Sequence, residues 1–384
     1  MFHRQCLLFL LLALWPDVPG RADEVDQLLR DVQAVSKQGA GSPAARAAWE
    51  KLVARGPAVL PRLLDAMDTP DTVVANWLRT AFDRIVDTER NAGGKRIDAD
   101  ALLAFAKDAR HQGRARRLAL EVVEQLRPGT RERLLVGWLN DPEFRHDAVE
   151  QRLDALDRDK GMSRERAVAA YREAFAATRE IEQGRRAAAR LKTLGVEVSV
   201  AEHLGFLSDW YAIGPFDARG MKGFGTVYPP EKKVDLKETC EGKDGKKLQW
   251  KRYRVAEMPG GRFPILVDLR QPLGDAEDAV AYAWTSFRAD AAREVEFRGA
   301  ADDNFTVWVN GEHAFGFEEY RNGVRLDRHR FRVRLRAGVN TVLVKVCQAP
   351  STPANREPNW EFLLRITDAS GKGLAFKSAL PEER

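Results

Sequence analysis

Cysteine is scarce in this sequence. The 384 residues include three, at Cys6, Cys240 and Cys347, and Cys6 lies in an apolar run at the N-terminus. The other two are too far apart in sequence for a Cys-x-x-Cys motif, which excludes a redox pair or a zinc site built on cysteine spacing. Outside the cytoplasm these two can pair as a disulfide; alternatively, Cys347 ends an expected strand as a small buried apolar residue.

The common catalytic motifs are also missing. The sequence contains no Gly-x-Ser-x-Gly, no His-Glu-x-x-His and no phosphate-binding loop. Its six histidines are scattered, and His313 and His329 are interpreted as isolated surface residues, not as a pair across strands. We therefore expect a protein that is not an enzyme. An enzyme with an unrecognised site stays an alternative, because the separation of two catalytic carboxylates is a property of the folded chain.

A charge excess of one sign is lacking too. The 62 basic and 57 acidic residues leave a net charge of +5, spread over both halves of the chain. Because neither half of the chain has a large positive charge, a nucleic-acid partner is not expected.

Only one long apolar run occurs, at the N-terminus. Arg4 precedes the run 6–15, which is too short to span a bilayer comfortably, and Pro16, Gly20 and Ala22 follow it. This pattern predicts a signal peptide over residues 1–22, with an uncleaved anchor as the alternative. No later run is long enough for a transmembrane segment. We expect the mature chain to be secreted, periplasmic or otherwise extracytoplasmic.

After the N-terminal run, the apolar residues recur with the spacing of α-helices. In residues 24–36 the apolar side chains recur on one helical stripe, and Gly56-Pro57 and residues 68–71 (Asp-Thr-Pro-Asp) separate further helices. One long helix is predicted over residues 163–194. A cluster of basic residues is interpreted as a solvated helix face whose charges are balanced by nearby acidic residues. The cluster consists of Arg110, Arg114, Arg116 and Arg117.

Two stretches resemble HEAT-type helical hairpins. One is the succession of helix, Gly-Pro, helix and Asp-Thr-Pro-Asp over residues 43–71, and the other is the Asn-Asp-Pro turn at residues 140–142 with the helix after it. The resemblance implies that helix pairs stack and form an extended surface. Such a surface acts as a scaffold or spacer, or binds a protein partner.

The composition changes after residue 198. Gly, Pro and aromatic residues become frequent, and the apolar period shortens to two in segments such as 279–287 and 293–298. Many short strands with Gly, Pro and Asn turns, and no helices between them, predict an antiparallel β-sandwich, a jelly roll. The expected fold class is thus multidomain α plus β. Its parts are an N-terminal α-helical hairpin repeat domain (23–160), a long connecting helix (161–198) and the β-sandwich (199–384).

Several motifs in this last part resemble galactose-binding-like β-sandwich domains. They are WYAIGPF at 210–216, ADDNFTVWVNG at 301–311, the strand 338–346 and the segment 360–366. The Asp-Asp turn is also similar to that of protective-antigen-type sugar-binding domains, in which paired aspartates hold calcium. That family usually continues with glycine, where this chain has Asn304. The resemblance implies a carbohydrate or another surface polymer as ligand, and Asp302 and Asp303 as candidate calcium ligands.

Five residues form the predicted ligand site: Asp302, Asp303, Trp308, Arg325 and Asp327. Aspartate offers hard oxygen ligands, but it also caps backbone N–H groups in turns. Trp308 can stack on a sugar ring or face a second buried layer. Arg325 and Asp327 can bind a polyol or each other. The sequence therefore predicts a secreted, non-catalytic binding protein. The alternative is a structural or assembly module that binds only protein partners.

Overall fold

The computed structural model describes residues 21–35, 41–320, 323–351 and 359–381. Nearly all of the predicted signal peptide, residues 1–20, lies outside these ranges. Within them, no helix is long and apolar enough to cross a membrane. The chain divides into two compact units, residues 1–144 and 145–384. This division falls inside the range that the sequence assigned to helical repeats.

The first unit is helical in its described part. Its helices pack through apolar stripes, as the spacing in the sequence predicts, and Asp71 and Asp98 accept hydrogen bonds from backbone N–H groups at two helix starts. The elements are α1 (Arg21–Gln33), α2 (Ser42–Arg55), the 3₁₀ turn η1 (Gly56–Val59), α3 (Leu60–Ala66), α4 (Thr72–Asn91), α5 (Ala99–Lys107), α6 (Gly113–Leu126) and α7 (Thr130–Leu135).

The basic cluster on α6 is not simply a solvated face. Arg110 does pair with Asp108 at the surface, but Arg116 is fully buried. Its guanidinium forms two hydrogen bonds with the carboxylate of Asp141, at 2.6 and 3.1 Å, and one with the carbonyl of Ala106. The interpretation as a solvated face is therefore wrong for Arg116, which ties the Asn-Asp-Pro turn to α6.

The second unit begins with helices and continues with strands. The helices are α8 (Arg145–Arg158), α9 (Arg164–Ala177), α10 (Ile181–Thr193), α11 (Val200–His203), α12 (Pro229–Lys232) and α13 (Arg270–Leu273), with the 3₁₀ turn η2 (Lys243–Gly245). The single long helix predicted over 163–194 is wrong, because α9 and α10 are separate. Thr178 lies in an extended conformation between them, and its buried hydroxyl donates to the carbonyl of Phe175 and lies 3.0 Å from Nε2 of His203.

The strands form antiparallel sheets, so the mixed α and β content predicted from the sequence is confirmed. They are β1 (Asp209–Asp217), β2 (Cys240–Glu241), β3 (Lys247–Leu248), β4 (Lys251–Arg254), β5 (Val267–Asp268), β6 (Ala279–Ala289), β7 (Arg293–Asp302), β8 (Phe305–Val309), β9 (Glu312–Phe317), β10 (His329–Leu335), β11 (Gly338–Gln348), β12 (Glu361–Thr367) and β13 (Lys377–Ser378).

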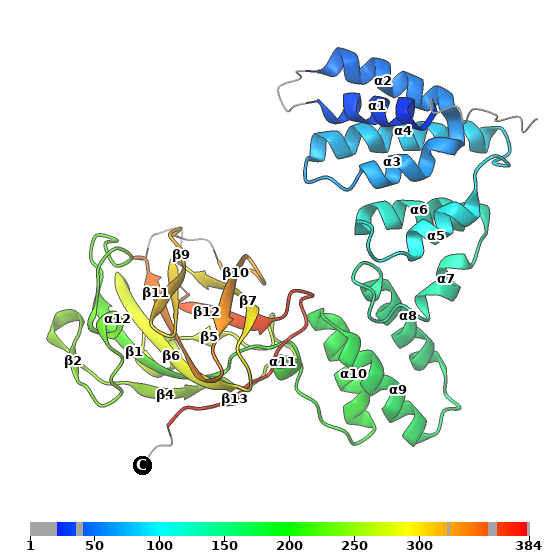
Figure 1. The fold of residues 1–384 in the computed structure, drawn as a ribbon. Helices are drawn as coiled ribbons and strands as arrows, with labels where there is room; N and C mark the ends of the chain where they lie inside the picture. Colours follow the sequence, from blue (N-terminus) through cyan, green and yellow to red (C-terminus); the bar gives the residue numbers. More distant parts are fainter. Residues whose placement is uncertain (1–20, 36–40, 321–322, 352–358, 382–384) are drawn as a thin grey trace, which may run out of the picture. The chain divides into compact units, whose positions relative to one another are not determined.

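Two sheets make up most of the second unit. The larger has the order β4-β1-β6-β11-β8-β9, with β13 also paired to β6, and the smaller has the order β10-β7-β12-β5. The long strands β6 and β11 run side by side in the larger sheet (Figure 1). Side chains of the two sheets meet in the core, where the rings of Trp210 and Phe362 are 5.1 Å apart. Trp360 also donates from its indole to the carbonyl of Val346.

The two cysteines of this unit do not form a disulfide. Cys240 and Cys347 are both free and buried, and burial raises the pKa of the Cys347 thiol to about 12. Both pack into the apolar cluster on the outer face of the larger sheet, together with Ile213, Phe216 and Tyr282. Of the two alternatives for Cys347, the small buried apolar residue is the one observed.

Candidate functional site

Trp308 lies in a row of side chains that crosses the larger sheet. Residues paired directly across antiparallel strands project from the same face, so a chain of such pairs defines a line perpendicular to the strands. Each neighbouring pair in the row is a register partner. From one edge to the other the row is Arg252, Tyr211, Trp284, Leu343, Trp308 and His313.

The members of this row contact one another. The guanidinium of Arg252 lies 5.7 Å from the ring centre of Tyr211, and the rings of Tyr211 and Trp284 are 6.4 Å apart. The rings of Trp308 and His313 meet edge to face at 6.0 Å. Both tryptophans are half-buried, so part of each indole stays accessible. Because one strand separates β6 from β8, the two tryptophans are about 10 Å apart along the row.

A pocket of about 330 Å³ opens over the centre of this row. Its floor comes from β6, β11 and β8, and its wall comes from α12 and the two residues after it. The lining residues are Trp284, Trp308, Leu343, Thr341, Asn310, Gly311, Pro230, Glu231, Lys232, Lys233 and Val234. The site thus combines two indoles with an amide, a hydroxyl and two exposed ammonium groups.

Lys345 fixes the wall of this pocket. Its side chain is 2% exposed and lies on β11, two residues from Leu343. The ammonium donates to Glu231 Oε1 at 2.8 Å and to the carbonyls of Phe224 and Thr226. The hydroxyl of Tyr282 also donates to Glu231. Because Glu231 accepts from both Lys345 on β11 and Tyr282 on β6, it joins the 224–234 segment to the sheet.

The two aspartates lie away from Trp308. Asp302 ends β7 and Asp303 follows it, joined by a cis peptide bond. The Asp303 N–H bonds to the carbonyl of Cys347, whereas Trp308 pairs with Leu343. These two residues of β11 are four positions apart, which is roughly 13 Å. The Asp303 carboxylate accepts a hydrogen bond from the Ala349 N–H at 2.7 Å. The predicted site residues are therefore not together, and the contact of Asp303 is with a residue 46 positions later, not within its own turn.

Further carboxylates neighbour Asp302. Glu361 on β12 is the register partner of both Asp302 and Asp268, so three acids line up across the smaller sheet. Burial, followed by the charge of Asp303, raises the pKa of Asp302 to about 6. Burial and the charge of Asp268 raise the pKa of Glu361 to about 7. Among the described residues, no group of three or more His, Cys, Asp or Glu side chains has a metal-binding arrangement.

Arg325 and Asp327 do not pair in the described part of the chain. Arg325 is exposed. The carboxylate of Asp327 instead accepts hydrogen bonds from Arg298 at 3.0 Å and from Nε of Arg365 at 2.7 Å. Burial alone would raise the pKa of Asp327, but the hydrogen bonds and charges of Arg365 and Arg298 outweigh it and hold the pKa below its usual range. Asp327, in the turn before β10, is thus committed to ion pairs with two arginines of the smaller sheet.

The sequence did not identify Trp284, Leu343 or the wall at residues 230–234 as parts of a site. One feature of the sequence could have marked Trp284. The segment 279–287 is apolar enough for a central strand, and a large tryptophan stands among its small residues. The register that places it beside Trp308 is a property of the folded sheet. Lys345 carries another signal, as a lone charge within the apolar run from Val342 to Val346.

No family model and no curated protein sequence matches this chain. Solved structures show distant likenesses. An anti-sigma factor domain-containing protein from Clostridium clariflavum has a TM-score of 0.25 and 12% identity, covering 46% of this chain and 49% of that one. A beta-glucuronidase from an uncultured Clostridium has a TM-score of 0.24 and 10% identity, covering 43% and 29%. This chain thus spans about half the length of the first protein and under a third of the second.

A PA14 sugar-binding domain from an RTX adhesin is another distant neighbour. Its TM-score is 0.23 at 12% identity, and the match covers 45% of this chain and 95% of that domain. All three TM-scores lie below 0.5, so none of these likenesses identifies a family or a ligand.

Proposed function

We propose that this protein is an exported, non-catalytic binding protein whose second unit holds an extended carbohydrate chain on the row at Trp284, Leu343 and Trp308. The observation that carries the proposal is the alignment of two half-buried indoles on neighbouring strands, under an open pocket with a polar wall. In this proposal the sheets form a jelly-roll β-sandwich, and the helices are HEAT-like repeats that act as a scaffold or bind a protein partner.

The chemistry of the row suits sugar rings. An indole presents a large flat apolar face with a negative quadrupole, and the C–H face of a pyranose is apolar and slightly positive. Two indoles about 10 Å apart can each hold one ring of a chain that runs across the strands. The side chains of Thr341 and Lys233 lie at the pocket, where they can hydrogen-bond sugar hydroxyl groups.

Replacing Trp308 or Trp284 with alanine tests this proposal. We expect each variant to lose at least about tenfold in polysaccharide affinity, which is about 1.4 kcal/mol, because each removes one stacking face. Retardation in native gels that contain soluble polysaccharides, with the full chain, measures the change. Phe331→Ala is the matched control, since Phe331 is a half-buried aromatic residue of the smaller sheet.

Two results would count against the carbohydrate site. One is the absence of retardation of the wild-type chain across neutral and acidic polysaccharides. The other is unchanged retardation of both tryptophan variants while their melting temperatures match that of the wild type. Either result would leave the assembly module, which binds only protein partners, as the better account.

Calcium at Asp302 and Asp303 is a separate part of the proposal. Their two carboxylates offer up to four hard oxygens, and a calcium ion would take the rest of its six to eight ligands from backbone carbonyls and water. Calcium at ten times its dissociation constant should stabilise the wild type by about 1.4 kcal/mol and raise its melting temperature by a few degrees.

The double variant Asp302→Asn/Asp303→Asn provides the comparison. Asparagine at 303 still accepts from the Ala349 N–H, so the turn is kept while the charge is lost. The calcium-induced shift in melting temperature should vanish in this variant. An equal shift in both proteins, or none in the wild type at millimolar calcium, would rule out a calcium site here.

A further inference from the structure

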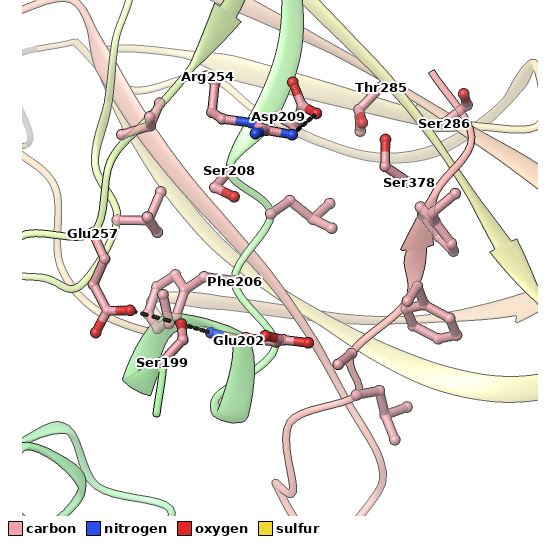
Figure 2. A pocket seen from close by; sticks show the side chains of 18 residues that line it. Ser199, Glu202, Phe206, Ser208, Asp209, Arg254, Glu257, Thr285, Ser286 and Ser378 are labelled. Carbon is pink, nitrogen blue, oxygen red and sulfur yellow. Dashed lines mark hydrogen bonds and ion pairs between the residues drawn. The ribbon is translucent and has the colours of Figure 1, made fainter. Parts of the chain in front are cut away.

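A second pocket lies where β1 separates from β6. The two strands pair at Tyr211 and Trp284, and β13 pairs with β6 only from Phe287 onward. Thr285 and Ser286 therefore lie between the two partner strands. A cavity of about 360 Å³ opens at this place, bounded by α11, the start of β1, β4 and the segment before β13 (Figure 2). It shares no lining residue with the pocket at Trp308.

Three residues with hydroxyl side chains, Ser208, Thr285 and Ser286, line this cavity. Thr285 and Ser286 are 4% and 2% exposed, yet both line the cavity. Within the described ranges, no hydrogen bond joins either of these hydroxyls, or that of Ser208, to another residue. None of these hydroxyl oxygens is among the fully buried unpartnered atoms of the described residues, so each is open to the cavity. Water, or a ligand that displaces it, can supply their hydrogen-bond partners.

Two of the carboxylates that line the cavity accept hydrogen bonds from other groups of the protein. Asp209 accepts hydrogen bonds from Arg252 at 2.8 Å and from Arg254 at 3.2 Å. Glu257 accepts from the Ser199 hydroxyl at 2.6 Å and from the Val200 N–H at 3.0 Å. Glu202 is exposed. Three carboxylates and one guanidinium line the cavity, and Glu257 is bonded only to neutral donors. The lining is therefore acidic, which favours a neutral ligand over an anion.

The rest of the lining is apolar. Phe206, Val255 and Ile265 are buried residues with surfaces on the cavity. In Figure 2, Ser208, Thr285, Ser286 and Ser378 lie around the opening. An apolar lining with a few converging polar groups, and a volume above about 300 Å³, is typical of small-molecule sites.

We propose that this cavity binds a neutral polyhydroxylated ligand of monosaccharide size. The hydroxyl groups of Ser208, Thr285 and Ser286 would bond to its hydroxyls, and its C–H face would lie against Phe206 and Ile265. The site is distinct from the row at Trp308. It does not depend on the proposed binding of a polysaccharide chain.

Titration calorimetry of the full chain with D-glucose, D-galactose and myo-inositol tests this assignment. We expect saturable binding of at least one probe to the wild type. Thr285→Val/Ser286→Ala removes both buried hydroxyls at nearly constant volume and should weaken that binding at least tenfold. Ser208→Phe fills the cavity and should abolish it. Phe331 lines neither pocket, so Phe331→Ala should bind the probe as the wild type does. Ser208→Phe should keep polysaccharide retardation, which separates this site from the polysaccharide site.

Three outcomes would overturn the assignment. The first is no saturable binding of any of the three probes. The second is unchanged affinity in both the double variant and Ser208→Phe, with melting temperatures like that of the wild type. The third is tighter binding of D-glucuronate than of D-glucose, which would show that the cavity selects an anion. If the wild type binds a monosaccharide but shows no retardation by polysaccharides, only the proposal for the row at Trp308 is contradicted.

Discussion

Asp327→Ala is expected to lower the free energy of unfolding by about 3 kcal/mol, the largest effect among the predicted site residues. The substitution removes the carboxylate that faces Arg365, which is 3% exposed, and Arg298, which is 9% exposed. Arg298 keeps its contact with Glu296, whereas the charge of Arg365 is left buried without a carboxylate. Urea unfolding followed by tryptophan fluorescence measures the change. Arg325→Ala is the control and should change stability by less than about 0.5 kcal/mol.

The same ion pair predicts a pH dependence. The pKa of Asp327 is lower in the folded state than in the unfolded state. Its contribution to the free energy of unfolding is therefore fully present at pH values above the unfolded-state pKa of about 3.9. The contribution is lost as the pH falls through the folded value, because the carboxyl is then protonated in both states. The difference in stability between wild type and Asp327→Ala should therefore be largest near neutral pH and shrink in acid. A difference that grows in acid would contradict this account.

Glu231→Ala should also lower the free energy of unfolding by about 3 kcal/mol, and it should weaken polysaccharide binding. The Lys345 ammonium would keep only the carbonyls of Phe224 and Thr226, and the Tyr282 hydroxyl would lose its acceptor. Because Glu231 joins the 224–234 segment to the sheet, the wall of the pocket at Trp308 should loosen. Chemical unfolding and gel retardation on the same samples measure the two effects.

Two further variants distinguish this explanation from a general loss of charge. Lys232→Ala removes an exposed charge from the same wall and should leave the stability within about 0.5 kcal/mol. The double variant Glu231→Leu/Lys345→Met replaces both buried charges with apolar groups and should recover much of the lost stability. If the double variant is less stable than Glu231→Ala, the ion pair is not what holds the segment.

Much of the fold could be predicted because its signals are local. Helical spacing and the Gly-Pro break at residues 56 and 57 identified helices of the first unit. The Asn-Gly pair at 310 and 311 is typical of a hairpin turn, and both residues do have positive φ angles, 56° and 84°. The break between α9 and α10 escaped prediction. Thr178, which lies in the break, contacts His203, 25 residues later in the chain.

The site was harder to predict because its residues meet through register. Trp308 was identified by its residue type, whereas Trp284 joins it only because β11 pairs with both strands. Asp327 looked available for a ligand, but its partners Arg298 and Arg365 are 29 and 38 residues away in the sequence. Neither separation leaves a recognisable pattern along the chain.

The aromatic row also restricts which changes in length this part of the chain can accept. Each of its side chains comes from a different strand, and successive residues of a strand face opposite sides. Inserting or deleting one residue within β6, β11 or β8 would turn the contributing side chain into the core and expose a core residue instead. The turn at Asn310 and Gly311 and the segment after Phe317 lie outside the paired stretches. Variation in length should therefore be confined to such loops, while the strands beneath the row keep their lengths.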